Sequence, residues 1–159
     1  MAGLLPLYQW FDQTAIAGLI RSSNWLFPAI EAVHIVALCV LFGAILLLNL
    51  RLFGIALRST PVAKLARELA PWTTCGIVFM LSTGVLLFAS EAIKCYQSPP
   101  FQLKMIFLAL AIAFHFTIYG KVTRSPETEH RPMSRWLAAS VSLVLWFGIG
   151  FAGRAIAFY

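Results

Sequence analysis

Residues 31–54 read EAVHIVALCVLFGAILLLNLRLFG, and this stretch decides the class of the protein. Between His34 and Arg51 it holds no charged residue, and most of its positions are Leu, Ile, Val, Ala or Phe. A helix that crosses the bilayer needs about 20 predominantly apolar residues. A strand of a membrane barrel would instead alternate apolar and polar residues. We therefore expect a transmembrane helix over Trp25–Leu50.

Three more segments of the chain have the same apolar character. Hydrophobic residues make up 60% of the 159 residues and charged residues only 11%, which is more apolar than a soluble domain of this size. Pro71 falls near the start of the second segment, where its missing N–H costs little. The sequence therefore predicts an all-α integral membrane protein, a bundle of four transmembrane helices. The other spans are expected at Pro71–Ala92, Phe101–Gly120 and Arg135–Tyr159.

Residues 1–24 differ from these spans. Apolar side chains such as Leu7 and Trp10 lie there beside the polar Asp12 and Gln13. The stretch shows neither the charged start nor the clear cleavage site of a signal peptide. We expect an amphipathic helix that lies in the membrane interface, and a mobile tail is the alternative.

The basic residues predict how the chain is oriented in the bilayer. The net charge is +6, and eight of the twelve Lys and Arg residues lie in two segments, 51–70 and 121–135. Short loops rich in Lys and Arg face the cytoplasm in membrane proteins. The N-terminus, the 93–100 loop and the C-terminus are then expected on the outer side. This placement argues for a lipid bilayer, and against nucleic acid, as the partner of the basic residues.

Motifs that bind metals at a fixed spacing are missing. Cys39, Cys75 and Cys95 form no CxxC or CxxCH, so the sequence offers no zinc, thioredoxin-like or covalent c-type haem site. Glu31 and His34 form an E-x-x-H, but a di-iron bundle needs two such motifs and further carboxylates.

Ionisable residues inside the expected spans are costly and are functional hypotheses by default. Because a helix rises about 1.5 Å per residue, His34, 17 residues before Arg51, lies roughly 25 Å from the cytoplasmic edge. Lys104, 17 residues before Lys121, lies at the same depth, whereas His115 lies only about 9 Å from that edge. One haem iron between His34 and His115 is therefore disfavoured, and His34 with Lys104 fits one iron better. The ionisable residues of the spans are Glu31, His34, Lys104, His115 and Arg154.

Each of these residues also has a purely structural explanation. His34 and His115 can hydrogen-bond a neighbouring helix, and Lys104 can extend its ammonium to the interface. Glu31 can orient His34 or its bound partner. Arg154 can reach the interface or pair with an acidic group such as a haem propionate. The residues alone leave these alternatives open.

The first and third spans resemble those of a known group. An early His34, an LRLFG exit at 50–54, and Lys104 followed eleven residues later by His115 are similar to the HemJ type, four-helix membrane proteins that are haem-binding protoporphyrinogen oxidases. The copper-resistance CopD group is similar in outline. The chain resembles more closely an uncharacterised family of small bacterial membrane proteins. Its signatures, W-x-F-P-x-x-E-x-x-H and D/N-L-R-L-x-G, stand here at 25–34 and 49–54.

The resemblance covers about residues 25–121 and implies a b-type haem in a bacterial inner membrane. It implies His34 and Lys104 as axial ligands and His115 as a second functional residue. The fourth span departs from the HemJ pattern, because residues 134–146 read SRWLAASVSLVLW and lack the Asn-Glu-x-Pro stretch of that group. The resemblance therefore implies the haem more directly than it implies the HemJ substrate and activity.

Three functions follow from the sequence as hypotheses. The first is a haem b redox protein that moves electrons to or from a quinone or a partner subunit, or that has a HemJ-like oxidoreductase activity. The second is a cofactor-free subunit of a larger membrane complex, and the third is copper handling of the CopD kind. Four short helices make a thin wall around a haem, so a homo-oligomer or hetero-complex is expected.

Overall fold

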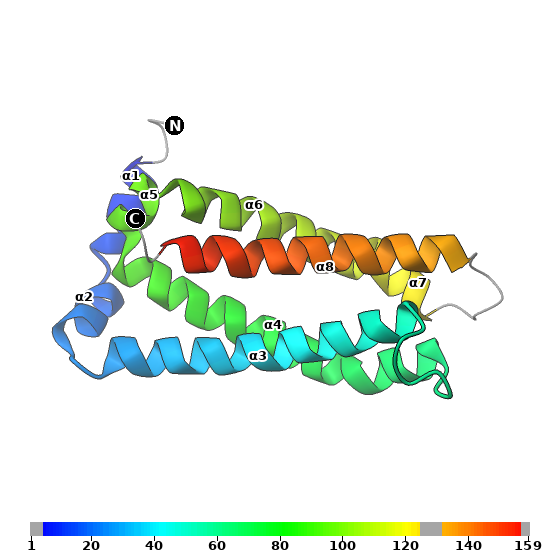
Figure 1. The fold of residues 1–159 in the computed structure, drawn as a ribbon. Helices are drawn as coiled ribbons and strands as arrows, with labels where there is room; N and C mark the ends of the chain where they lie inside the picture. Colours follow the sequence, from blue (N-terminus) through cyan, green and yellow to red (C-terminus); the bar gives the residue numbers. More distant parts are fainter. Residues whose placement is uncertain (1–4, 125–131, 157–159) are drawn as a thin grey trace.

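A computed structural model describes residues 5–124 and 132–156 of the chain (Figure 1). Four of its helical segments are long and apolar enough to cross a membrane, and no strand occurs in the described ranges. The prediction of an all-α membrane bundle is thus confirmed. The spans are α3 (Leu26–Leu52), α4 (Val62–Ser90), the continuous stretch Pro99–Arg124, and α8 (Pro132–Ala155).

The third span is not a single α-helix. It begins as α6 (Pro99–Phe114), passes through the π-helical segment η2 (His115–Tyr119), and ends as α7 (Gly120–Arg124). π-helical turns inside α-helices are rare, and those that occur are often found at functional sites. In η2 the rings of His115 and Tyr119 stack, with 5.5 Å between their centroids.

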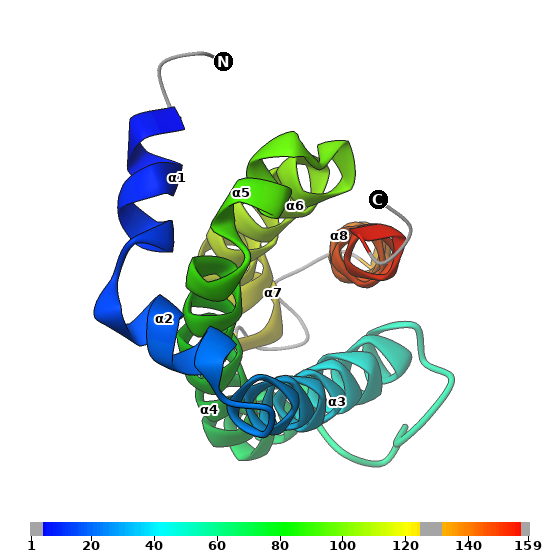
Figure 2. The same ribbon diagram turned by 90° about the vertical axis from the view of Figure 1, so that its left-hand side faces the viewer.

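Successive spans run in opposite directions, so the bundle has two different ends (Figure 1). At one end, which we call the α5 end, the spans meet the short helices α1 (Leu5–Asp12), α2 (Ala15–Ser22) and α5 (Ala92–Gln97). Figure 2 shows the bundle from this end. The opposite end, which we call the basic end, holds the 53–61 loop. Its described Lys and Arg residues are Arg51, Arg58, Lys64, Arg67, Lys121, Arg124 and Arg135.

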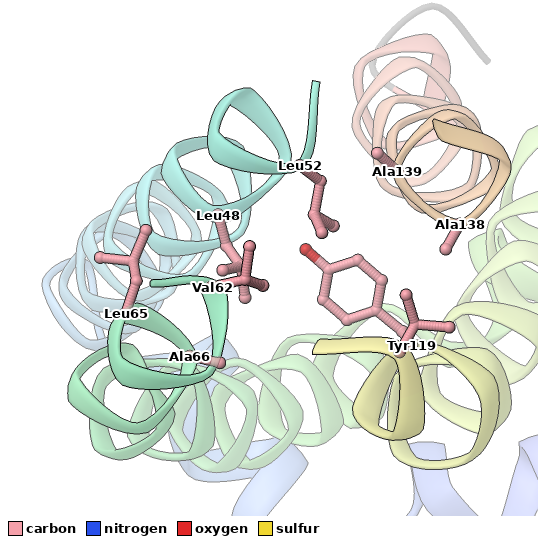
Figure 3. Close-up of a cluster of buried hydrophobic side chains, with 9 residues drawn as sticks. Leu48, Leu52, Val62, Leu65, Ala66, Tyr119, Ala138 and Ala139 are labelled. Carbon is pink, nitrogen blue, oxygen red and sulfur yellow. The ribbon is translucent and has the colours of Figure 1, made fainter. Parts of the chain in front are cut away.

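Two clusters of buried apolar side chains fill the bundle. One lies near its middle and includes Leu41, Ile77 and Trp146, from three different spans. Here α4 approaches α3 closely, because a Cβ at Gly76 would lie only 2.8 Å from the Cβ of Leu41. The other cluster lies at the basic end, where apolar side chains of α3, α4 and α8 surround Tyr119 (Figure 3).

The second span begins at Val62, nine residues before the expected start at Pro71. Val62, Leu65 and Ala66 are buried against the cluster at the basic end, which extends the helix into the segment expected to be a loop. Pro71 therefore lies inside α4 rather than near its start. Thr73 supports this turn, because its hydroxyl donates to the carbonyl oxygens of Leu69 and Ala70, at 3.1 and 3.0 Å.

Residues 5–22 form two helices rather than one. Thr14 separates them and caps α2, because its hydroxyl oxygen accepts from the backbone N–H of Ala17 at 3.3 Å. Arg21 joins both helices to the bundle, donating to the Asp12 carboxylate at 2.6 Å and to the Ser90 carbonyl at 3.3 Å. Helices α1 and α2 thus cover the α5 end of α4 (Figure 2).

Candidate functional site

His34 lies in the third turn of α3, and α4 holds its ring. Nδ1 of His34 lies 2.8 Å from the hydroxyl oxygen of Thr83. That hydroxyl has a single hydrogen, which it donates to the carbonyl oxygen of Phe79 at 2.6 Å. The hydroxyl must therefore accept from His34, so Nδ1 carries a proton. In the neutral ring the lone pair of Nε2 then remains available as a ligand.

This arrangement resembles that of histidines that bind metals. Such a histidine usually donates its other ring N–H to a nearby oxygen, which fixes the tautomer and the direction of the ligating nitrogen. The backbone carbonyl of Met80 also acts on the His34 ring. Thr83 was missed in the sequence, because a threonine inside an apolar helix commonly bonds only its own backbone, which leaves no signal of a partner.

Glycines on neighbouring helices make room for both His34 and Lys104. A Cβ at Gly84 of α4 would lie 3.4 Å from Cε1 of His34. A Cβ at Gly153 of α8 would lie 3.6 Å from Nζ of Lys104. The imidazole and the amine therefore occupy the space that larger side chains on α4 and α8 would need.

Lys104 lies at the same end of the bundle as His34, as the depth calculation predicted. Its side chain is partly buried, and its charge acts on both His34 of α3 and Cys95 of α5. Burial raises the pKa of the Cys95 thiol to about 11; Lys104 and Lys94 oppose this rise and Glu91 adds to it. The Lys104 nitrogen makes no hydrogen bond or ion pair with the described residues, and it would have to be a neutral amine, with its lone pair available, to act as a ligand.

Two other residues expected near this site are exposed. Glu31 makes no hydrogen bond or ion pair with the part of the chain that the structure describes, so the group that orients His34 is Thr83 rather than Glu31. Arg154 lies in the last turn of α8, beside Gly153 and at the α5 end. Its position suits a group that pairs with acidic substituents at the edge of the site.

His115 lies apart from His34, at the basic end. It lines a cavity together with Ile45 and Leu48 of α3, which follow His34 by 11 and 14 residues, or about 16 and 21 Å along the helix. Its Nδ1 is buried and has no hydrogen-bond partner in the described structure. The expectation that His34 and His115 do not share one iron agrees with this separation.

A buried polar network joins three spans close to His115. The Tyr119 hydroxyl donates to the side-chain oxygen of Asn49 at 2.9 Å, and the Asn49 amide donates to the Ser142 hydroxyl at 3.2 Å. None of the three residues is more than 1% exposed. The sequence did not indicate that the three residues of this network contact one another. Asn49 was its only visible sign, as a polar residue within an apolar run and within the 49–54 signature.

The described residues contain no group of three or more His, Cys, Asp or Glu side chains that could hold a metal ion. His34 and Lys104 supply two donors at most. A metal at this site would therefore need a carrier with its own equatorial donors, and a porphyrin is such a carrier. The described part of the chain offers no cluster of such ligands to support copper handling.

A comparison with protein families matches residues 8–159 of the chain to DUF6644, described as a family of unknown function. No curated protein matches the chain, and no solved structure does. The match spans all four transmembrane segments, so the site described above lies within the region shared with the family.

Proposed function

The chain belongs to DUF6644, a family of unknown function, and from the geometry of its site we propose that it is a haem b-binding redox protein of the membrane. The observation that carries the proposal is the hydrogen bond from His34 to Thr83. Because Nδ1 is held by this bond, the tautomer is fixed and the other ring nitrogen, Nε2, keeps the lone pair that a haem ligand needs.

Lys104 is the candidate for the second axial position. It approaches from α6, whereas His34 approaches from α3, and Gly153 leaves space beside its amine. Two ligands on different spans at one depth are what a helical bundle offers to a cofactor in its core. Arg154, at the end of α8, would be the residue that pairs with a propionate.

When bound, the haem would supply one-electron chemistry, whose potential depends on the axial ligands and on the burial of the site. The protein holds the ligands, fixes the His34 tautomer and surrounds the site with apolar helices. The electron partner in this proposal is a quinone or a partner subunit. Because the bundle has only four spans, the proposal includes a homo-oligomer or a hetero-complex.

We place the site toward the outer face of a bacterial inner membrane. The support is the position of His34 and Lys104 at the α5 end, opposite the basic end, whose loops are expected in the cytoplasm. Labelling of an introduced cysteine at Ser59 and at Lys94 in intact cells and in inverted vesicles would test this orientation. The proposal requires that only Lys94→Cys be labelled from outside.

The test of the proposal is the absorption spectrum of the detergent-purified protein, produced with ample haem, before and after reduction with dithionite. We expect a Soret band and sharp reduced α and β bands. His34→Ala should lose the haem, whereas His115→Ala, the matched change of the other intramembrane histidine, should retain it.

A featureless visible spectrum would reject the redox function and favour the cofactor-free subunit. Stoichiometric haem in His34→Ala would reject the assigned ligand. Loss of haem in both histidine variants, with folding verified by circular dichroism and gel filtration, would show that the residues at the α5 end do not hold the haem without His115.

A further inference from the structure

A cavity of about 500 Å³ lies at the basic end, between α3, α4 and the η2–α7 part of the third span. One side of it is apolar and includes Ile45 and Leu48 of α3 and Leu69 of α4. The other side carries the side chains of His115, Lys121 and Arg124. The cavity therefore has the two-sided character that an amphiphilic ligand needs.

The cations of this cavity meet no carboxylate among the described residues. Lys121 and Arg124 are exposed, and neither makes a hydrogen bond or ion pair with the part of the chain that the structure describes. No Asp or Glu occurs among the described residues that line the cavity. Two positive charges that converge on one hollow favour an anion there.

His115 also belongs to the lining of this cavity. Its Nδ1 is buried without a hydrogen-bond partner among the described residues. A buried polar atom that stays unpaired inside a membrane bundle is costly. Two threonine hydroxyls of the lining, those of Thr73 and Thr123, already donate to backbone carbonyls at 3.1 and 2.9 Å.

We propose that this cavity binds the phosphate headgroup of an anionic phospholipid, with the acyl chains along its apolar side. Lys121 and Arg124 would meet the phosphate through charge-assisted hydrogen bonds. Basic pockets between transmembrane helices at the cytoplasmic side suit such headgroups. This site is separate from the His34 site and does not depend on haem.

Native mass spectrometry of the whole, delipidated protein in detergent tests the proposal. Phosphatidylglycerol and phosphatidylcholine of equal chain length are added in parallel. We expect phosphatidylglycerol to bind about tenfold more tightly, or better, because only it carries a net negative charge to meet both cations. The double variant Lys121→Gln, Arg124→Gln should lose this preference.

The matched control is Lys64→Gln, Arg67→Gln, which removes two exposed charges at the same end but outside the cavity lining. It should keep the preference for phosphatidylglycerol. Equal binding of the two lipids, or an equal loss in both double variants, would overturn the proposal. Displacement of the lipid by inorganic phosphate at the same concentration would assign the cavity to soluble phosphate instead.

Discussion

The hydroxyl of Tyr119, in the π-helical segment, donates to the side-chain oxygen of Asn49 on α3, and both residues are fully buried. This bond spans 70 positions of the sequence and connects the first span to the third. We expect Tyr119→Phe to destabilise the folded bundle by about 1–2 kcal/mol, because the Asn49 oxygen would remain buried without its donor.

Denaturation of the purified protein in mixed micelles, followed by circular dichroism, measures this change. Tyr8→Phe is the matched control, since the described structure records ring contacts for Tyr8 but no hydrogen bond of its hydroxyl. A similar loss of stability in both variants would mean that the Tyr119 hydroxyl contributes nothing specific.

Thr83→Val is predicted to weaken the binding of haem without destroying the fold. Valine has the shape of threonine but cannot accept the proton of His34 Nδ1, so the imidazole loses the bond that fixes its orientation. Removal of such an outer hydrogen bond typically lowers metal affinity by about 10- to 100-fold. Haem titration and the midpoint potential of the bound haem are the measurements.

The neighbouring Ser82 provides the control for this variant. Its hydroxyl donates to the Val78 carbonyl at 2.8 Å and is exposed, so Ser82→Ala should leave the haem unchanged. If Thr83→Val binds haem with the wild-type affinity and potential, then Thr83 does not position a ligand.

Gly76→Ala is predicted to destabilise the contact between α3 and α4. The new methyl group would lie 2.8 Å from the Cβ and 3.1 Å from the Cα of Leu41, so the backbone itself would have to move. Overpacking of this kind costs roughly 1–3 kcal/mol. The melting temperature of the purified protein should fall accordingly.

Gly43→Ala is the comparison, because a Cβ at that position of α3 would meet no atom within 4 Å. There the gain in helix propensity should dominate and stabilise the protein slightly, by up to about 1 kcal/mol. Melting temperatures that fall equally in both variants would contradict the close packing at Gly76.

The thiol of Cys95 is predicted to react slowly and with a steep dependence on pH. Burial raises its pKa to about 11, so the reactive thiolate is a minor species at neutral pH. In a Cys39→Ser, Cys75→Ser background, the rate of alkylation by iodoacetamide should rise about tenfold per pH unit and reach no plateau below about pH 11.

Lys104→Met should make this thiol slower still at a given pH, since the Lys104 charge opposes the rise in its pKa. A plateau near pH 9, the ordinary range of a cysteine, would show that the thiol is not buried. An unchanged rate in Lys104→Met would show that the charge of Lys104 does not act on the Cys95 thiol of α5.

The sequence predicted the spans well because each is a continuous apolar run, which a bilayer explains and a soluble core does not. It also predicted that His34 and Lys104 lie toward the same end of the bundle, since helix rise converts residue number into depth. The predicted start of the second helix at Pro71 was wrong, because Val62 and Leu65 are buried by tertiary packing and the helix begins before the proline.

Pairings across helices could not be read from the sequence. The contact of Thr83 with His34 depends on how α3 and α4 are rotated against each other, and Tyr119 meets Asn49 from a π-helical segment. Neither a helix rotation nor a π-turn has a signature in a run of apolar residues. The family match covers residues 8–159 and assigns no role to any residue.

The network of Asn49, Tyr119 and Ser142 has a consequence for the synthesis of the protein. Asn49 enters the membrane with the first span, Tyr119 with the third and Ser142 with the fourth. Until α8 arrives, the Asn49 amide has no Ser142 to receive its proton, and hydrocarbon offers no substitute. A chain stopped after the third span therefore retains an unsatisfied polar group in the bilayer until the fourth span supplies its partner.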